Sequence, residues 1–396
     1  MTRKRVVAVF TGNRAEYGLQ FPILKAIAAH PRLSYRLIVS GAHLDPHFGK
    51  TMAEIKKDGF RVHAEVKIDM AGDTLFSTAN AIGTGIVSMS RALKRMRPDI
   101  LVVYADRFEG FAALVAGTQM RIPTAHIEGG DITEGGALDD SVRHAMTKLA
   151  HLHFTTNADA RRRIMAMGEE PWRVHDVGFP AIDLIAARCF ADARQVRDRF
   201  GLCEDRPAAL FTQHSVTTQF DQAAAQIRPS LRALDILARR GVQVLVTYPI
   251  NDAGGRAIIK EIESWGRRSR PDIQIHQNLG RYNYHGVLDF IGRRSGGACL
   301  GNSSSGIKET PAFLCPAINI GSRQDGRLRA RNVIDTAYDA KQITEAFERC
   351  LGDRRFLKKC RAGDNPYGNG RSGKKIASVL ARVDLGARLI VKKMTL

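Results

Sequence analysis

The stretch that decides the fold is VVAVFTG (6–12), an apolar run that ends in a glycine, read together with the two segments that follow it. A helical pattern, PILKAIAAH (22–30), comes next, and then a second apolar run, YRLIVSG (35–41). Short runs rich in β-branched and aromatic residues are typical of strands. Strand, helix and strand at this spacing predict a right-handed βαβ crossover and a parallel sheet that is covered on both faces.

The same alternation continues along the chain in two series. The first half adds five runs: VHAEVKI (62–68), ILVVYA (100–105), TAHIEG (124–129), LHFTTN (152–157) and VHDVG (174–178). A second series follows the polar helical stretch DARQVRDRFGL (192–202): AALFTQH (208–214), VQVLVTYP (242–249), IQIHQNL (273–279), GACLGN (297–302) and AINIG (317–321). Helical patterns such as TANAIGTGIVSMSRALKRM (78–96) lie between the runs.

We therefore predict an α/β protein with two Rossmann-like, doubly wound domains that face each other across a cleft. The expected domains are residues 1–190 and 191–371, followed by a helical C-terminal segment, 372–396. In such sheets ligands bind outside the carboxyl ends of the strands, which predicts a site in the cleft between the domains.

Composition limits the class of protein. With 44% hydrophobic and 25% charged residues, the 396-residue chain is typical of a globular protein and not of a disordered one. No run of eighteen apolar residues predicts a membrane span, and the short run VVAVF near the start does not fit a signal peptide, so we expect a cytoplasmic protein. The six cysteines form no CxxC pair, which argues against zinc-ribbon and thioredoxin-like sites.

The formal net charge of +20 raises the possibility of a nucleic-acid partner. The basic residues are dispersed along the chain, for example in RALKRMR (91–97) and RRSR (267–270), without interleaved aromatic residues or a known reader motif. We interpret them as solvated surface and expect no nucleic-acid partner.

Two segments that follow predicted strands fit a phosphate-bearing ligand. In TGNRAEYG (11–18) a glycine turn leads into a helix, and Arg14 supplies a forked cation suited to a diphosphate; a plain turn with a surface arginine is the alternative. In GNSSSGIKE (301–309) the serines and small-residue amides would cradle phosphate, and Glu309 could accept hydrogen bonds from ribose hydroxyls. A capping box would explain the same residues, and the absence of a GxxxxGK[ST] loop leaves ATP hydrolysis unsupported.

Ionisable residues are concentrated after consecutive strands of the first domain. Asp106, Arg107 and Glu109 follow one strand, His126, Glu128 and Asp131 surround the end of the next, and Asp139, Asp140, Arg143 and His144 lie in DDSVRH. Crowded carboxylates shift one another's pKa values, as a proton-transfer site requires. The His, Asp and Glu spacings match no standard ligand pattern, so we expect no metal. His214, at the end of AALFTQH, could pair with phosphate or move a proton, although a structural histidine is the usual alternative.

Taken in order, seven blocks resemble the hydrolysing UDP-N-acetylglucosamine 2-epimerase family, and the resemblance runs from about residue 6 to about 335. The blocks are TGNRAEYG, YADRFEG, HIEGGD, DDSVRHAMTKLAHLH, QHSVTT, GNSSSGIKE and NIGSRQDGR. The resemblance implies a glycosyltransferase-B-like pair of domains, no metal or nicotinamide cofactor, and the reaction UDP-GlcNAc + water → ManNAc + UDP in sialic-acid-type sugar synthesis. We also expect a homodimer or homotetramer.

The resemblance also implies roles for individual residues. Asp106, Glu128 and one or both of Asp139 and Asp140 would be the acid and base groups around C1 and C2 of the sugar. Arg14, Ser303, Ser304 and Arg323 would hold the diphosphate, Glu309 the ribose, and His214 would assist the departure of UDP.

Three alternatives stay open at this point. The stretch ITEGGAL (132–138) is longer than its counterpart in the sialic-acid-pathway enzymes, and a longer loop near the sugar fits UDP-2,4-diacetamido-2,4,6-trideoxyglucose as substrate. A non-hydrolysing epimerase would share the same site residues. A glycosyltransferase would share the fold but would need an acceptor.

Overall fold

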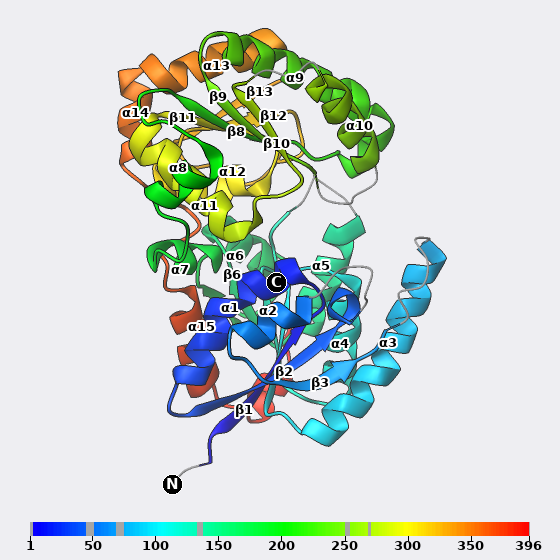
Figure 1. Cartoon of the computed structure of the whole chain (residues 1–396). Helices are drawn as coiled ribbons and strands as arrows, with labels where there is room; N and C mark the ends of the chain where they lie inside the picture. The colour runs from blue at the N-terminus through cyan, green and yellow to red at the C-terminus, as the bar shows by residue number, and fades with distance from the viewer. Residues whose placement is uncertain are drawn as a thin grey trace. The chain divides into compact units, whose positions relative to one another are not determined.

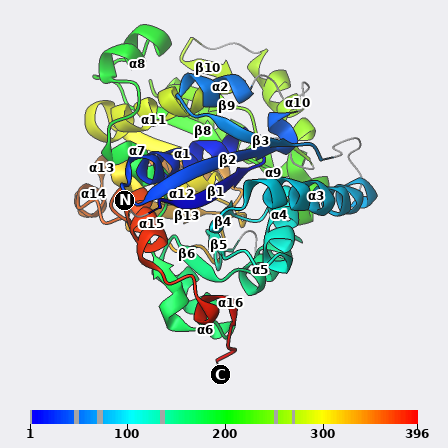
Figure 2. The ribbon, with the colours of Figure 1, turned by 90° about the horizontal axis from the view of Figure 1, so that it is seen from below.

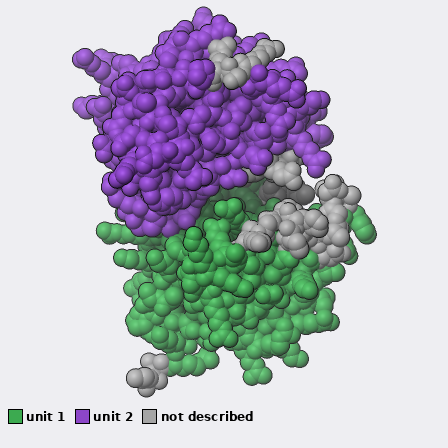
Figure 3. Space-filling view, in the orientation of Figure 1, with its two compact units in different colours: residues 1–132, 138–183, 367–396 green, residues 133–137, 184–366 purple. Residues whose placement is uncertain are grey.

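The computed structural model describes residues 3–44, 51–68, 75–132, 138–249, 254–267 and 271–395. The chain divides into two compact units, shown in different colours in Figure 3. Unit 1 comprises residues 1–132, 138–183 and 367–396, and unit 2 comprises residues 133–137 and 184–366. The boundaries expected after residues 190 and 371 stay predictions; this division falls after residues 183 and 366 and returns the end of the chain to unit 1.

Unit 1 is built on a seven-stranded, entirely parallel sheet with the strand order β3-β2-β1-β4-β5-β6-β7 (Figure 1). Its strands are β1 (Arg5–Thr11), β2 (Leu33–Ser40), β3 (Val62–Val66), β4 (Ile100–Tyr104), β5 (Thr124–Ile127), β6 (Leu152–Thr155) and β7 (Val174–Asp176). Its helices are α1 (Arg14–Ala29), α2 (Thr51–Lys57), α3 (Leu75–Met96), α4 (Phe108–Gln119), α5 (Leu138–Leu149), α6 (Ala158–Ala166), α15 (Ser372–Arg382) and α16 (Ala387–Ile390); α7 (Ala181–Ala186) spans the division between the units.

Helices cover both faces of this sheet because successive strand residues point to opposite sides. In β1, Val7 and Val9 pack into the core that includes α1 and α15, while Ala8 and Phe10 pack into the core that includes α3, α4 and α5. Figure 2, a view from below, shows α15 beside α1 and the pair α3 and α4 along another side of the sheet. The chain's last helical segment therefore completes a core begun by its first strand.

Unit 2 repeats the plan with six parallel strands in the order β10-β9-β8-β11-β12-β13. They are β8 (Ala208–Thr212), β9 (Gln243–Thr247), β10 (Ile273–His276), β11 (Gly297–Gly301), β12 (Ala317–Ile320) and β13 (Val333–Thr336). The core on one face includes α9 (Ala223–Arg239), α10 (Gly255–Gly266), α13 (Ala340–Gly352) and α14 (Arg354–Arg361). On the other face lie α8 (Ala193–Phe200), α11 (Gly280–Phe290) and α12 (Ser304–Lys308) (Figure 1).

Both sheets have the strand order of a doubly wound fold, and every strand predicted from the sequence is present. The predicted fold class is therefore confirmed. In each sheet the order reverses at a switch point, between β1 and β4 in unit 1 and between β8 and β11 in unit 2. Ligands bind at such points, beyond the carboxyl ends of the strands.

Two elements differ from the prediction. Helix α1 begins at Arg14, directly after the glycine turn, and is longer than the pattern PILKAIAAH (22–30), because Asn13 caps it: the Asn13 Oδ1 atom accepts a hydrogen bond from the Glu16 N–H at 3.0 Å. The edge strand β13 was not predicted, and its sequence, VIDT, is short and only partly buried.

The cysteines and the possibility of a membrane span were also considered from the sequence. All six cysteines are free thiols, four of them buried. Over the residues that the structure describes, no helix is long and apolar enough to cross a membrane.

Candidate functional site

Two residues with strained backbones stand at the carboxyl edge of the unit 1 sheet. Ala105, directly after β4, has φ of 54°, and Glu128, directly after β5, has φ of 65°. Residues with a Cβ rarely adopt this left-handed conformation, and such strain clusters at functional sites. The sheet imposes it: the Ala105 N–H donates to the Ile127 carbonyl and the Glu128 N–H to the Phe154 carbonyl, both at 2.9 Å. The turns that follow hold Asp106 and Glu128 at neighbouring strand ends.

Arg143 brings two more of the predicted residues together. This buried arginine lies on α5, where it pairs with Asp140 at 3.1 Å and with Asp106 after β4. We name Asp106, Glu128, Asp140 and Arg143 the carboxylate cluster. Of Asp139, also a predicted acid or base, only the backbone in the first turn of α5 is described.

Two buried, uncharged side chains, His126 and Tyr104, lie on the strands that lead to Glu128 and Asp106. His126 on β5 is fully buried, and burial lowers its pKa to about 4, so the ring is neutral near pH 7. Its Nε2 atom lies 2.6 Å from the Ala105 carbonyl, which can only accept, so Nε2 carries the proton. Burial, and next the charge of Glu128, raise the pKa of Tyr104 well above its usual value. His126 therefore fixes the strained turn, and Tyr104 keeps its hydroxyl proton.

A second pair of carboxyl groups, Glu109 from the predicted concentration of ionisable residues and Glu16, which was not predicted, lies at the carboxyl ends of the same strands. Glu16 on α1 is 5% exposed and its Oε2 atom accepts from the Gly12 N–H at 2.8 Å. Glu109 on α4 is fully buried and pairs with Arg107 at 3.2 Å. A Cβ built at Gly12 would lie 3.5 Å from both the Glu109 carboxyl carbon and Glu16 Oε2, so the two carboxyl groups are close. Burial, and then the charge of Glu109, raise the pKa of Glu16 to about 8.

Arg14, the predicted diphosphate ligand of unit 1, is the first residue of α1. Its side chain is 61% exposed, and its Nε atom pairs with Glu54 of α2 at 2.9 Å. An exposed pair of this kind is weak, so a diphosphate could compete with Glu54 for the guanidinium.

In unit 2, Asn302, which follows β11, is hydrogen-bonded to His214, which follows β8, at the switch point of the sheet. The Asn302 Oδ1 atom accepts from the His214 N–H at 2.6 Å, and its Nδ2 group donates to the His214 carbonyl at 2.9 Å. Gly301 before it has φ of 119°, and a Cβ there would lie 1.9 Å from the Thr212 carbonyl oxygen. Only glycine allows β11 to approach β8 this closely, which sets His214 beside the serine loop, residues 301–306.

The serine loop leads into α12 and toward Glu309. Ser303 is the N-cap of α12, Ser304 is its first residue, and the Ser305 hydroxyl donates to Glu309 Oε2 at 2.8 Å. The same oxygen lies 2.9 Å from His285 Nε2 of α11. Burial raises the pKa of Glu309, but His285 and Ser305 outweigh it, and the net shift is downward. Glu309 is therefore an ionised, fixed acceptor.

Arg323 completes the group in unit 2. Its Nη1 atom donates to the Asn302 carbonyl at 3.2 Å, and Gln324 donates to the same carbonyl at 2.7 Å. Burial, and next the positive charge of Arg323, lower the pKa of His214 to about 3. A neutral histidine beside an arginine can donate one ring proton or accept another, and an arriving anion would raise its pKa.

The structure thus gathers eight of the ten predicted residues into two groups; Arg14 lies apart, paired with Glu54, and the Asp139 side chain is outside the described part of the structure. Asp106, Glu128 and Asp140 lie together in unit 1; His214, Ser303, Ser304, Glu309 and Arg323 lie at the switch point of unit 2. Arg143 was named from the sequence among the concentrated ionisable residues but was given no role of its own, although it is one helical turn from Asp140. Glu16 and Asn302 were not predicted as site residues. Among the described residues, no group of three or more His, Cys, Asp or Glu side chains could hold a metal ion.

Comparison with known proteins agrees with this arrangement. The family model described as UDP-N-acetylglucosamine 2-epimerase matches residues 25–381. A Campylobacter jejuni protein named GDP/UDP-N,N'-diacetylbacillosamine 2-epimerase (hydrolyzing) is 32% identical over 87% of each chain. A Neisseria meningitidis protein named UDP-N-acetylglucosamine 2-epimerase is 30% identical over 89% of each chain.

A solved structure has the same fold. The crystal structure of UDP-GlcNAc 2-epimerase from Neisseria meningitidis bound to UDP-GlcNAc superposes with a TM-score of 0.80, covering 96% of this chain and 100% of the other at 17% identity. The family model covers most of the sequence, and both of these relatives are at least 30% identical over most of their length. The chain belongs to the UDP-N-acetylglucosamine 2-epimerase family.

Proposed function

We propose that this chain is a hydrolysing 2-epimerase that converts UDP-GlcNAc and water to ManNAc and UDP. The observation that carries the proposal is the carboxylate cluster, in which Asp106 and Glu128 stand on strained turns at adjacent strand ends and Arg143 joins Asp106 to Asp140. Inverting C2 requires groups that remove a proton from one face of the sugar and return one on the other.

The reaction has two stages in this proposal. A carboxylate of the cluster takes the C2 proton as the bond from C1 to the UDP oxygen breaks, which leaves a C1–C2 double bond and free UDP. Water then adds its hydroxyl to C1 and gives its remaining proton to a carboxylate of the cluster, while a protonated carboxyl group delivers a proton to the opposite face of C2. Asp106, Glu128, Asp139 and Asp140 are the candidate acids and bases, and positive charge that develops on the sugar is stabilised by those that stay ionised.

The departure of UDP needs compensation for negative charge on the diphosphate. Arg14, Ser303, Ser304 and Arg323 are the proposed diphosphate ligands, and Glu309 is the proposed ribose ligand. His214, neutral beside Arg323, gains a partner when the diphosphate arrives, so it can hold or deliver a proton at the leaving oxygen.

The test is product analysis in heavy water. Incubation with UDP-GlcNAc alone should release UDP and ManNAc carrying deuterium at C2, followed by NMR. UDP-ManNAc without free sugar would instead identify a non-hydrolysing epimerase. Release of free sugar without deuterium at C2 would refute proton transfer at that carbon, and a requirement for an acceptor would indicate a glycosyltransferase.

A second substrate, UDP-2,4-diacetamido-2,4,6-trideoxyglucose, is favoured by two observations. The Campylobacter relative is named for N,N'-diacetylbacillosamine, which is this sugar. The second is the expectation from the family resemblance that ITEGGAL (132–138) is longer than its counterpart in the sialic-acid-pathway enzymes; residues 133–137 lie outside the described part of the structure. Parallel incubations with both nucleotide sugars decide between them: kcat/KM should favour one by at least about tenfold.

A further inference from the structure

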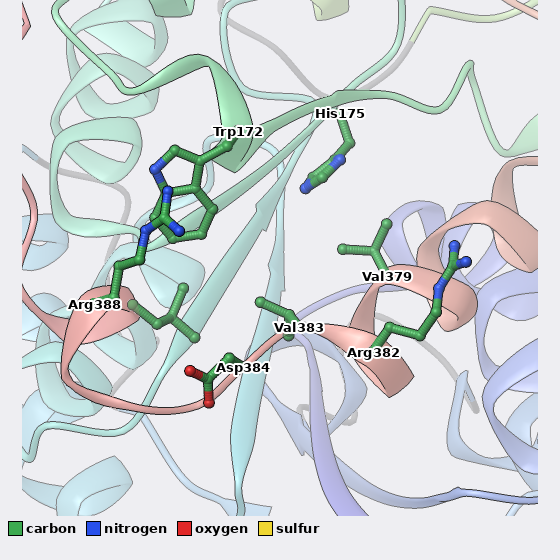
Figure 4. Close-up of a pocket in the computed structure, with 8 residues that line it drawn as sticks. Trp172, His175, Val379, Arg382, Val383, Asp384 and Arg388 are labelled. Atoms are coloured by element: carbon green, nitrogen blue, oxygen red, sulfur yellow. The ribbon is translucent and has the colours of Figure 1, made fainter.

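Unit 1 contains a cavity of about 370 Å³ that lies away from the carboxylate cluster. Trp172 and His175, at β7, form one side of it, and residues of the C-terminal segment from Val379 to Leu389 form the other (Figure 4). This volume is within the range of sites that hold small organic ligands.

The cavity lies near the amino-terminal ends of the strands, whereas Asp106 and Glu128 lie beyond the carboxyl ends. Trp172 precedes β7, and its neighbour Arg173 donates to the carbonyl of His151, which precedes β6, at 3.2 Å. The Arg5 side chain, at the start of β1, donates to the Leu380 carbonyl. Trp172, His151 and Arg5 therefore lie at or just before the first residues of strands, whereas the carboxylate cluster lies beyond the last residues of strands.

The wall made by the C-terminal segment is held in place by Arg173. This fully buried side chain donates to the carbonyls of Leu389 at 2.7 Å, Arg388 at 2.8 Å and Val391 at 3.0 Å. Because charge-assisted hydrogen bonds are the strong ones, the wall keeps its shape without a ligand. A preformed cavity loses little entropy when a ligand binds.

The lining combines an apolar surface with uncompensated positive charge. Trp172, Val379, Val383 and Leu389 supply the apolar part. Arg382 and Arg388 carry two charges against the single charge of Asp384, and within the described residues neither guanidinium forms an ion pair. The Arg388 guanidinium carbon lies 4.7 Å from the centre of the Trp172 ring, and Figure 4 shows it against the ring.

We propose that this cavity binds a small organic anion: an apolar ring or chain against Val379, Val383 and Leu389, next to Trp172, with a carboxylate, sulfonate or phosphate group that pairs with Arg382 and Arg388. The guanidinium carbons of Arg173 and Arg388 lie over the Trp172 ring, at 4.3 Å and 4.7 Å from its centre, so the ligand contacts the aliphatic wall beside this ring. The site is separate from the proposed epimerase site, so the proposal does not depend on the proposed function.

The two tryptophans of the chain make the proposal testable on the whole protein. The Trp172 indole N–H donates to Glu170 at 3.0 Å, while Trp265 lies on α10 in unit 2 and serves as an internal control. In a ¹H–¹⁵N spectrum assigned with the Trp265→Phe variant, naphthalene-1-sulfonate should shift the Trp172 indole signal with a Kd of about 0.1–1 mM. The Trp265 signal should stay in place.

Charge is tested with a double variant and a neutral probe. Arg382→Met with Arg388→Met should weaken naphthalene-1-sulfonate binding about tenfold. Lys374→Met, which removes a charge from the same helix outside the cavity, should leave binding unchanged. Binding of the neutral 1-naphthalenemethanol should be weaker than that of the sulfonate.

Three results would overturn the proposal. These are equal binding of the neutral probe, unchanged binding by the double variant, or equal shifts of both indole signals. A Trp172 signal that moves with protein concentration alone, together with self-association in analytical ultracentrifugation, would assign this face to a second copy of the chain instead.

Discussion

At the scale of single residues, Glu128 is one of the four carboxyl groups of unit 1 that are proposed as acids and bases. Its left-handed backbone, imposed by the hydrogen bond from its N–H to the Phe154 carbonyl, holds it at the carboxyl ends of the strands. The variant Glu128→Gln keeps the shape and removes the basic carboxylate. We expect turnover of the UDP-sugar, measured as free UDP, to fall about 10²–10⁴-fold while the Kd for UDP changes less than about threefold.

The matched control is Glu65→Gln on β3, which changes an exposed glutamate of the same unit. Full turnover by the Glu128→Gln variant would remove Glu128 from the proposed acid and base groups. A large loss of UDP affinity in this variant would mean that Glu128 acts on binding and not on proton transfer.

Glu16 provides a separate prediction, because its carboxyl group is buried beside that of Glu109. Its pKa rises from an ordinary 4.5 to about 8 in the folded protein. Between these two values the folded state binds more protons than the unfolded state, so the stability contribution of Glu16 falls as pH rises. Above about pH 8 the group is charged in both states and the full penalty remains.

The variant Glu16→Gln cannot ionise and should therefore gain stability at alkaline pH. The difference in Tm between this variant and the natural protein should be several degrees larger at pH 8.5 than at pH 5. Each kcal/mol of stability corresponds to about 2–4 °C in Tm. Glu65→Gln should show no such pH-dependent gain. The same Tm difference at both pH values would mean that Glu16 is already ionised at pH 5.

At the scale of elements, the end of the chain supports the helix that carries Asp140 and Arg143. The Lys392 ammonium group donates to the carbonyls of Lys148 and Ala150, at the carboxyl end of α5, both at 2.7 Å. It also pairs with Glu169 at 2.8 Å. A cation is favourable at this end of a helix because the last carbonyls lack partners within the helix.

Replacing Lys392 by Met should destabilise unit 1 by about 1–3 kcal/mol, because helix-end carbonyls and one ion-pair partner lose their donor. A drop in Tm measures this effect, and turnover should fall with it if α5 holds Asp140 and Arg143 in position. The neighbouring Lys393, whose side chain is exposed, supplies the control variant Lys393→Met. Equal Tm values for the two variants would contradict a role for Lys392 in holding α5.

The contrast between β1 and Lys392 explains what the sequence can predict. Strands such as β1 are found because their apolar runs carry a local signal and their burial follows from it. The contact between Lys392 and α5 joins residues more than two hundred positions apart, and nothing near either one signals it. The strained turns at Ala105 and Glu128 were hidden for the same reason, since hydrogen bonds from neighbouring strands impose them.

At the scale of the whole molecule, one plan is used twice, with different chemistry at each switch point. Carboxylates dominate the one in unit 1, whereas hydroxyl groups, His214 and Arg323 dominate the one in unit 2. A parallel sheet with this strand order has a switch point in proteins of any function. The fold therefore predicts where a ligand binds but not which ligand it is. The residue types at each site predict a division of labour: proton transfer depends on unit 1, and UDP affinity depends chiefly on unit 2.

This division can be measured by the stabilisation that UDP confers. A ligand at one hundred times its Kd stabilises the folded state by about 2.7 kcal/mol, which raises Tm. The Arg323→Met variant should need at least about tenfold more UDP for the same rise, because it loses a cation beside the serine loop. Arg194→Met, an exposed position on α8 in the same unit, should respond like the natural protein, and so should Glu128→Gln. If Glu128→Gln weakens the response to UDP and Arg323→Met does not, the proposed division of labour between the units is wrong.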